Sequence, residues 1–107
     1  MSKLISYWRS PHIAYHNKER GFYVIYGKYN HLNREKKSNK CIGLYWDNFP
    51  KVNDVLAPMV VPADIGKSIL AGLLQDAANK KEGVVLQNIL DAIDYFKPEN
   101  NRDSDIE

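Results

Sequence analysis

Two segments in the first half of the chain alternate their hydrophobic side chains with a period of two residues. In residues 21–29 the period assigns two sets to opposite faces: Phe22, Val24 and Tyr26 on one, and Tyr23, Ile25 and Tyr29 on the other. Residues 40–47 alternate likewise, with Ile42, Leu44 and Trp46 opposed to Cys41, Gly43 and Tyr45. Aromatic and β-branched residues suit a pleated surface. The pattern therefore predicts two strands, with one sheet face covered by helices and the other presenting tyrosines.

Shorter segments surround these two strands. Residues 4–9 predict a short strand that Ser10 and Pro11 close, and residues 48–58 show no regular pattern. The pattern of residues 58–62 predicts another short strand. Because prolines bracket it, we expect them at a sheet edge or at strand ends, where a missing N–H group does no harm.

From residue 63 the hydrophobic period changes to that of a helix. A first helix has an apolar stripe made of Ile65, Ile69, Leu73 and Ala77, with Leu70 and Leu74 beside it. A second helix over residues 83–97 has six apolar side chains that we expect to point inward: Val85, Leu86, Ile89, Leu90, Ile93 and Phe96. Pro98 ends it. Strands first and helices last predict an α+β fold: an antiparallel sheet of three to four strands with two C-terminal helices packed on one face.

The length and composition are those of one small globular domain. The chain has 107 residues, of which 44% are hydrophobic and 26% charged, so we expect a single domain over residues 1–98 and a polar, acidic tail over residues 99–107. It contains no apolar run near 18 residues, which argues against a membrane span. The single cysteine, Cys41, cannot form an internal disulfide, and this favours the reducing cytoplasm.

Charge and aromatic residues are both segregated along the chain. Residues 1–51 carry ten Lys and Arg against three acids (+7), whereas residues 52–107 carry five against ten (−5), which together give the net charge of +2. Ten of the twelve aromatic residues precede residue 50. Such asymmetry indicates binding partners rather than chemistry.

Motifs for catalysis or metal binding are incomplete. Gly66-Lys67-Ser68 resembles the end of a phosphate-binding loop, but Val61 stands where that loop needs glycine, and the segment falls inside the first predicted helix. His12 and His16 lack the further ligands of a metal site, and we expect them in an exposed loop. With His31 they could also form an acid/base set for RNA cleavage, but their spacing fixes no geometry. We therefore predict no enzyme, no cofactor and no metal.

The link between the two aromatic strands is strongly basic. Residues 28–40 contain five Lys and Arg and one Glu, and the candidate nucleic-acid contacts are Arg34, Lys36, Lys37 and Lys40. Cations that neutralise phosphate, beside tyrosines that stack on bases, are what single-stranded nucleic acid requires. The alternative is a charged loop that keeps the sheet soluble and protects its edges.

The C-terminal part is acidic. The carboxylates span the second helix and the tail: Asp91, Asp94, Glu99, Asp103, Asp105 and Glu107. Such a cluster can imitate nucleic acid and occupy the basic cleft of a nuclease. The alternative is a solvated helix face followed by a polar terminus.

One small cytosolic domain with aromatic strands, two terminal helices, an acidic cluster and no catalytic set resembles the bacterial immunity proteins of contact-dependent growth inhibition systems. The resemblance implies a non-enzymatic protein that binds a cognate toxin, often a tRNA-cleaving nuclease, and blocks its active site. On this interpretation the partner contacts are five acids and three tyrosine anchors: Asp91, Asp94, Glu99, Asp103, Asp105, Tyr23, Tyr26 and Tyr29. The oligomeric state stays open, and no membrane partner is expected.

Residues 21–80 are also similar, in the order of their predicted elements, to single-stranded DNA-binding domains of the transcriptional-coactivator and Whirly type. That resemblance implies nucleic-acid binding through the basic loop and the same tyrosines. The second helix and the acidic tail depart from this pattern.

Overall fold

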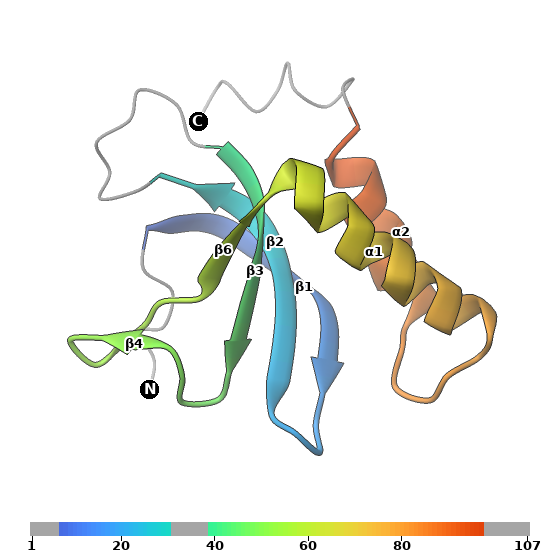
Figure 1. Cartoon of the computed structure of the whole chain (residues 1–107), viewed down its shortest axis with the longest axis horizontal. Helices are drawn as coiled ribbons and strands as arrows, with labels where there is room; N and C mark the ends of the chain where they lie inside the picture. The colour runs from blue at the N-terminus through green and yellow to red at the C-terminus, as the bar shows by residue number, and fades with distance from the viewer. Residues whose placement is uncertain (1–6, 31–38, 98–107) are drawn as a thin grey trace.

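The computed structural model describes residues 7–30 and 39–97, which form a four-stranded antiparallel sheet and two helices (Figure 1). The elements in chain order are β1 (Trp8–Asn17), β2 (Phe22–Tyr29), β3 (Asn39–Trp46), β4 (Lys51–Val52), β5 (Val55–Leu56), β6 (Met59–Pro62), α1 (Ala63–Ala78) and α2 (Leu86–Tyr95). The strand order is β1-β2-β3-β6, and β4 and β5 form a separate hairpin. The predicted α+β fold is confirmed, and so is the edge position of the proline-flanked strand.

One face of the sheet, called the helix face below, is covered by α1 and α2 (Figure 1). α1 packs on β3 and β6, and α2 packs on β1. The buried side chains of this cluster come from the sheet and both helices: Ala14, Val24, Tyr26, Ile42, Leu70, Ala92 and Phe96. Gly66 lets α1 approach closely, because a Cβ atom at this position would lie 2.5 Å from Cγ1 of Ile42.

The other face, called the aromatic face below, has its own cluster. Its buried members are Trp8, Ile25, Cys41 and Tyr45, and Tyr23, Tyr29 and Leu56 pack against them. The Trp8 indole lies over Gly43, where a Cβ atom would come within 2.8 Å of the ring. The period-two assignment of β2 and β3 to two faces is therefore confirmed.

The first strand differs from its prediction. We predicted residues 4–9, closed by Ser10 and Pro11; β1 instead starts at Trp8 and continues to Asn17, while residues 4–6 lie outside the described part of the chain. Its pairing with β2 shifts register between Arg9 and His12, and again between Ile13 and Tyr15. Pro11 is tolerated because it falls within the first irregularity of an edge strand, where no ladder N–H is needed.

Residues 48–58 are also more ordered than predicted. The β4–β5 hairpin turns at Asn53 and Asp54, whose φ angles of 53° and 66° lie in the left-handed region. Two central residues with positive φ are what a tight two-residue hairpin requires, and Asn and Asp tolerate them best after Gly. The hairpin brings Leu56 against the aromatic face.

Both helices bury a narrower stripe than the sequence predicted. In α1, Ile65 is 59% exposed, and Gly66 and Leu70 are the buried residues. Ile89 of α2 and Phe96 at its C-cap are buried as expected, and Ala92, which was not predicted, is buried with them. Three other predicted inward residues are exposed: Val85, Leu86 and Leu90. Val85 is the N-cap of α2, so it precedes the first helical turn. None of the helices described here is long and apolar enough to cross a membrane.

Candidate functional site

Of the predicted acidic contacts, the structure describes Asp91 and Asp94, which are exposed residues of α2. Asp91 accepts a hydrogen bond of 2.8 Å from Nε2 of Gln87, one helical turn earlier. Asp94 forms an ion pair of 3.6 Å with Lys97, and both side chains are more than half exposed. Exposed pairs of this kind are weak, so a partner can compete for either carboxylate. The other predicted acids, Glu99, Asp103 and Asp105, lie outside the described residues.

Two leucines lie beside these carboxylates. Leu86 and Leu90 are 47% and 42% exposed and are four residues apart, so they form a stripe along α2. Asp94 follows Leu90 by four residues and extends this stripe, and Asp91 lies on the neighbouring one. We call Leu86, Leu90, Asp91 and Asp94 the α2 surface. Its acids match the predicted partner contacts, whereas its leucines were predicted to point inward.

Tyr26 does not belong to this surface, although it was predicted as a partner anchor. It is only 7% exposed on the helix face, where its ring packs against Tyr95 at a centroid distance of 5.2 Å. Burial raises the pKa of Tyr26 above its ordinary value, and the negative charge of Asp91 raises it further. Because α2 covers its ring, Tyr26 is a core residue and not a surface anchor.

Tyr23 and Tyr29 lie on the aromatic face, which the sheet separates from the α2 surface. Tyr23 stacks on His16 at 4.1 Å and on Tyr45 at 4.6 Å, with interplanar angles of 8° and 4°. Tyr29 contacts Trp8 at 5.5 Å. Tyr23 and Tyr29 therefore lie on the opposite side of the sheet from Asp91 and Asp94, and both faces of the Tyr23 ring are occupied by neighbouring rings.

Besides burial, the carboxylate of Asp47 raises the pKa values of two tyrosines in this ring stack. Burial raises the pKa of Tyr23 above its ordinary value, and the hydrogen bond with Asp47 and the charge of Asp47 raise it further. The pKa of Tyr45 is raised by burial first, and then by interaction with Tyr23 and Asp47. A tyrosine whose neutral form is favoured in this way keeps its hydroxyl as a hydrogen-bond donor.

Only Lys40 of the predicted nucleic-acid contacts lies in the described part of the chain, since Arg34, Lys36 and Lys37 fall within residues 31–38. Its Nζ donates a hydrogen bond of 2.7 Å to the carbonyl oxygen of Tyr95 and lies 4.8 Å from the centre of that ring. Lys40 is thus a link between β3 and the end of α2. Across the sheet it pairs with Lys28, which in turn pairs with Arg9, so three cations share one row.

The two histidines lie in β1 rather than in the predicted loop. The register shift between Ile13 and Tyr15 turns them to opposite faces: His12 contacts Tyr26 at 5.3 Å, whereas His16 stacks on Tyr23. Within residues 7–30 and 39–97, no group of three or more His, Cys, Asp or Glu side chains is placed to hold a metal ion. The Gly66-Lys67-Ser68 segment lies within α1, as predicted.

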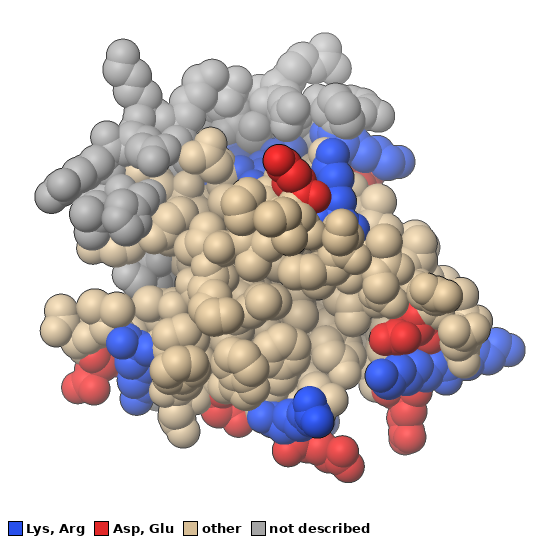
Figure 2. Space-filling model, in the orientation of Figure 1, with Lys and Arg blue, Asp and Glu red and all other residues tan. Residues whose placement is uncertain are grey.

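The distribution of charge over the surface is uneven. Seen from the side on which α1 lies in front, the centre of the molecule is largely uncharged, and Lys, Arg, Asp and Glu gather around the periphery (Figure 2). Exposed apolar side chains on this domain also include Trp46, Phe49 and Met59, which lie at the end of β3 and along β6. Broad uncharged areas rimmed by charges are typical of protein-binding surfaces.

Comparison with known proteins gives the chain no relative: no protein-family model, no curated sequence and no solved structure matches it.

Proposed function

We propose that this chain is a non-enzymatic, protein-binding domain that neutralises a cognate toxin, as the resemblance to immunity proteins of contact-dependent growth inhibition implies. The observation that carries the proposal is the α2 surface, in which exposed Leu86 and Leu90 adjoin Asp91 and Asp94. An apolar centre beside a charged rim is the usual organisation of an interface between proteins.

The acids favour a basic partner. A nuclease must hold a polyanion, so its active-site cleft is positively charged, and carboxylates on a rigid helix can occupy the sites of phosphates. The leucines would make dissociation slow, because apolar side chains are buried in the complex. The charges at the rim would mainly speed association. On this proposal the cytoplasm is where toxin and immunity protein meet.

The test uses the purified full chain and the toxin domain encoded beside it. We expect a one-to-one complex in size-exclusion chromatography and restored growth when both are co-expressed. Reversing Asp91 and Asp94 together to Lys should slow association about tenfold or more, because two steering charges change sign. Changing Leu90→Ser should instead speed dissociation.

The matched control is the pair Glu19→Lys and Glu82→Lys, which changes the net charge equally at exposed positions outside α2. If the reversed α2 pair protects as well as the control pair, the α2 surface is not the interface. If the purified chain itself cleaves RNA, the immunity proposal is wrong as a whole.

A second candidate, binding of single-stranded nucleic acid, is favoured by the cross-strand row of Arg9, Lys28 and Lys40. Cations aligned in one row can contact successive phosphates of an extended nucleic-acid backbone. The row lies at the end of the sheet from which residues 31–38, with Arg34, Lys36 and Lys37, depart. However, the stacked ring of Tyr23 offers no free face to a base.

This candidate makes a separate prediction. Fluorescence anisotropy with a labelled single strand should show affinity that falls steeply as salt rises, and Lys36→Glu with Lys37→Glu should weaken it further. Absence of sub-millimolar binding even at low salt would exclude nucleic acid without affecting the toxin test.

A further inference from the structure

A groove of about 330 Å³ lies between the two helices. Its apolar lining comes from α1 and α2: Leu70, Ala71, Leu74, Ile93 and Phe96. Leu70 and Phe96 are buried and form its floor, whereas Ala71 is an exposed residue of its rim. The lining therefore contains aliphatic groups and one aromatic ring, and these side chains offer no hydrogen-bonding group.

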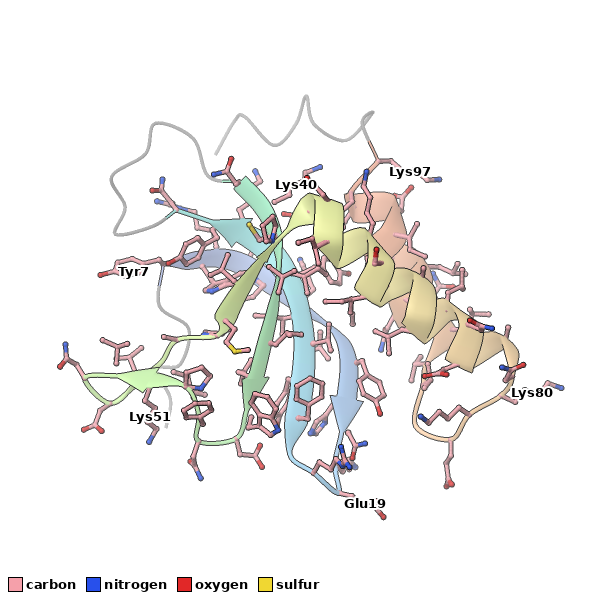
Figure 3. The ribbon with its side chains drawn as sticks, viewed as in Figure 1. Tyr7, Glu19, Lys40, Lys51, Lys80 and Lys97 are labelled. Carbon is pink, nitrogen blue, oxygen red and sulfur yellow. The ribbon has the colours of Figure 1, made fainter. Side chains whose placement is uncertain are left out.

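Two lysines provide the remaining lining, and both lie at the same end of the groove. α1 and α2 run in opposite directions along the sheet (Figure 1). Lys67, in the second turn of α1, and Lys97, which follows the end of α2 and is labelled in Figure 3, both line the groove. Lys97 is paired with Asp94 at 3.6 Å, but both side chains are largely exposed, and the pair is correspondingly weak. No carboxylate is among the residues that line the groove.

We propose that this groove binds a free fatty acid, with the hydrocarbon chain between α1 and α2 and the carboxylate between the ammonium groups of Lys67 and Lys97. A ligand for such a site needs one anionic end and an otherwise featureless apolar body. The volume is at the lower limit of ligand pockets, roughly 300–1,000 Å³, which suits one narrow chain better than a bulky molecule.

The length of the groove agrees with this ligand. From Lys67 to Leu74 the helix rises about 10 Å, at about 1.5 Å per residue. Beyond Ile93 the same side of α2 continues with Leu90 and Leu86, whose exposed side chains extend the apolar path for a longer chain. A partner helix would instead need a much larger contact area than this groove provides.

The test is a calorimetric titration of the purified full chain with dodecanoate, kept below the concentration at which the fatty acid aggregates. We expect saturable one-to-one binding, and we expect dodecyltrimethylammonium, which has the same chain and the opposite charge, to bind at least about tenfold more weakly because it meets two lysines. No toxin is present, so the result is independent of the function proposed above.

Two pairs of variants locate the site. Lys67→Glu with Lys97→Glu should weaken dodecanoate binding about tenfold, whereas Lys18→Glu with Lys51→Glu, at exposed positions on the strand side of the molecule, should not. Ala71→Trp should fill the groove and abolish binding, whereas Ala78→Trp, at another exposed alanine of α1, should leave it intact. Circular dichroism establishes that each variant is folded.

Several outcomes would overturn the proposal. They are the absence of dodecanoate binding, equal binding of the cationic detergent, and equal effects of Ala71→Trp and Ala78→Trp. Binding to vesicles of anionic phospholipid, or to an acidic amphipathic peptide, without binding of dodecanoate would also overturn it, and would assign the groove to a membrane or a protein instead.

Discussion

The two faces of the sheet are packed in different ways. On the helix face, aliphatic side chains of two helices interlock with those of the strands, and Gly66 brings α1 onto Ile42. On the aromatic face, rings lie on or beside each other, and Gly43 makes room for the indole of Trp8. Each face thus uses one glycine to admit a large neighbour. The difference teaches that the helix face is held by interlocking aliphatic side chains, whereas the aromatic face contains a ring stack in which Tyr23 and Tyr45 both interact with Asp47.

The largest expected effect is on the helix face. Ile89 is completely buried, so Ile89→Ala should lower the free energy of unfolding by about 2–5 kcal/mol through lost burial and the resulting cavity. Leu73, in the other helix, is only partly buried, and Leu73→Ala should cost less. Chemical denaturation measures both. An equal or larger cost at Leu73 would show that the helices pack differently.

The next effect concerns the close approach of α1 to the sheet. Gly66→Ala should destabilise the protein by about 1–3 kcal/mol, because the new methyl group meets Ile42. When Ile42 is already changed to Ala, the closest atom, Cγ1, is gone and only the Cβ atom of residue 42, at 3.2 Å, remains nearby, so the same substitution should cost markedly less. This difference between the two backgrounds, measured as a double-mutant cycle, is the signature of the contact. Equal effects in the two backgrounds would disprove it.

A smaller effect tests the aromatic face. Nε1 of Trp8 is buried and has no hydrogen-bond partner among the described residues. A buried donor without a partner destabilises the folded state by about 1–3 kcal/mol. Trp8→Phe removes this donor, and that gain offsets the stability lost with the smaller ring. We therefore expect a net change within about 1 kcal/mol in chemical denaturation, against about 3–5 kcal/mol for Trp8→Ala. If Trp8→Phe proves as costly as Trp8→Ala, the indole N–H is bonded.

The smallest effect is a decline in stability at high pH. Tyrosines on both faces cause it, and besides burial a different carboxylate raises the pKa of the tyrosines on each face. The pKa values of Tyr23, Tyr26 and Tyr45 are raised above 10.0, so the folded state holds these protons more tightly than the unfolded state. Their contribution to stability is complete below pH 10 and is lost as the pH rises through the folded-state pKa values. Denaturation at increasing pH should show this decline.

The two carboxylates distinguish the faces in this titration. Asp47→Asn should lower the pKa values of Tyr23 and Tyr45 and leave Tyr26 unchanged, while Asp91→Asn should lower only that of Tyr26. Burial, the first cause in each case, remains in both variants. The absorbance of tyrosinate follows the titrations. Identical curves for the two variants would show that the faces are not electrically separate.

The parts of the fold that the sequence predicted are those with a strong local period. Residues 21–29 and 40–47 alternate over their whole length, and period two leaves only one assignment of side chains to faces. The helix pattern after residue 63 was equally clear. These signals are local, so they are readable without knowing what the segments contact.

The errors arose where tertiary contacts override local signals. Pro11 suggested the end of a strand, yet β1 continues through it because irregular pairing removes the need for its N–H. Ile65 matched the helical stripe, but the sheet approaches α1 at Gly66, which has no side chain and so gave no hydrophobic signal. The turn at Asn53 and Asp54 did carry a local signal, which was missed.

The candidate site was half predicted for a similar reason. Charge is visible in a sequence, so Asp91 and Asp94 were found. Leu86 and Leu90 look like core residues in any helical pattern, and only the position of α2 on the sheet shows that they are exposed. Tyr26 shows the opposite error: it was predicted as an exposed anchor and is buried. Tyrosine occurs both in interfaces and in cores, so its position cannot be inferred from residue type alone.

The thiol of Cys41 can report the opening of the aromatic face. Cys41 is the only cysteine of the chain and is buried within that cluster, beside strands that the helices do not cover from that side. A thiol reagent reaches its sulfur when the cluster opens, so the labelling rate reports how readily the cluster opens. Labelling faster than global unfolding, measured on the same protein, would show that the aromatic cluster opens without unfolding of the whole domain.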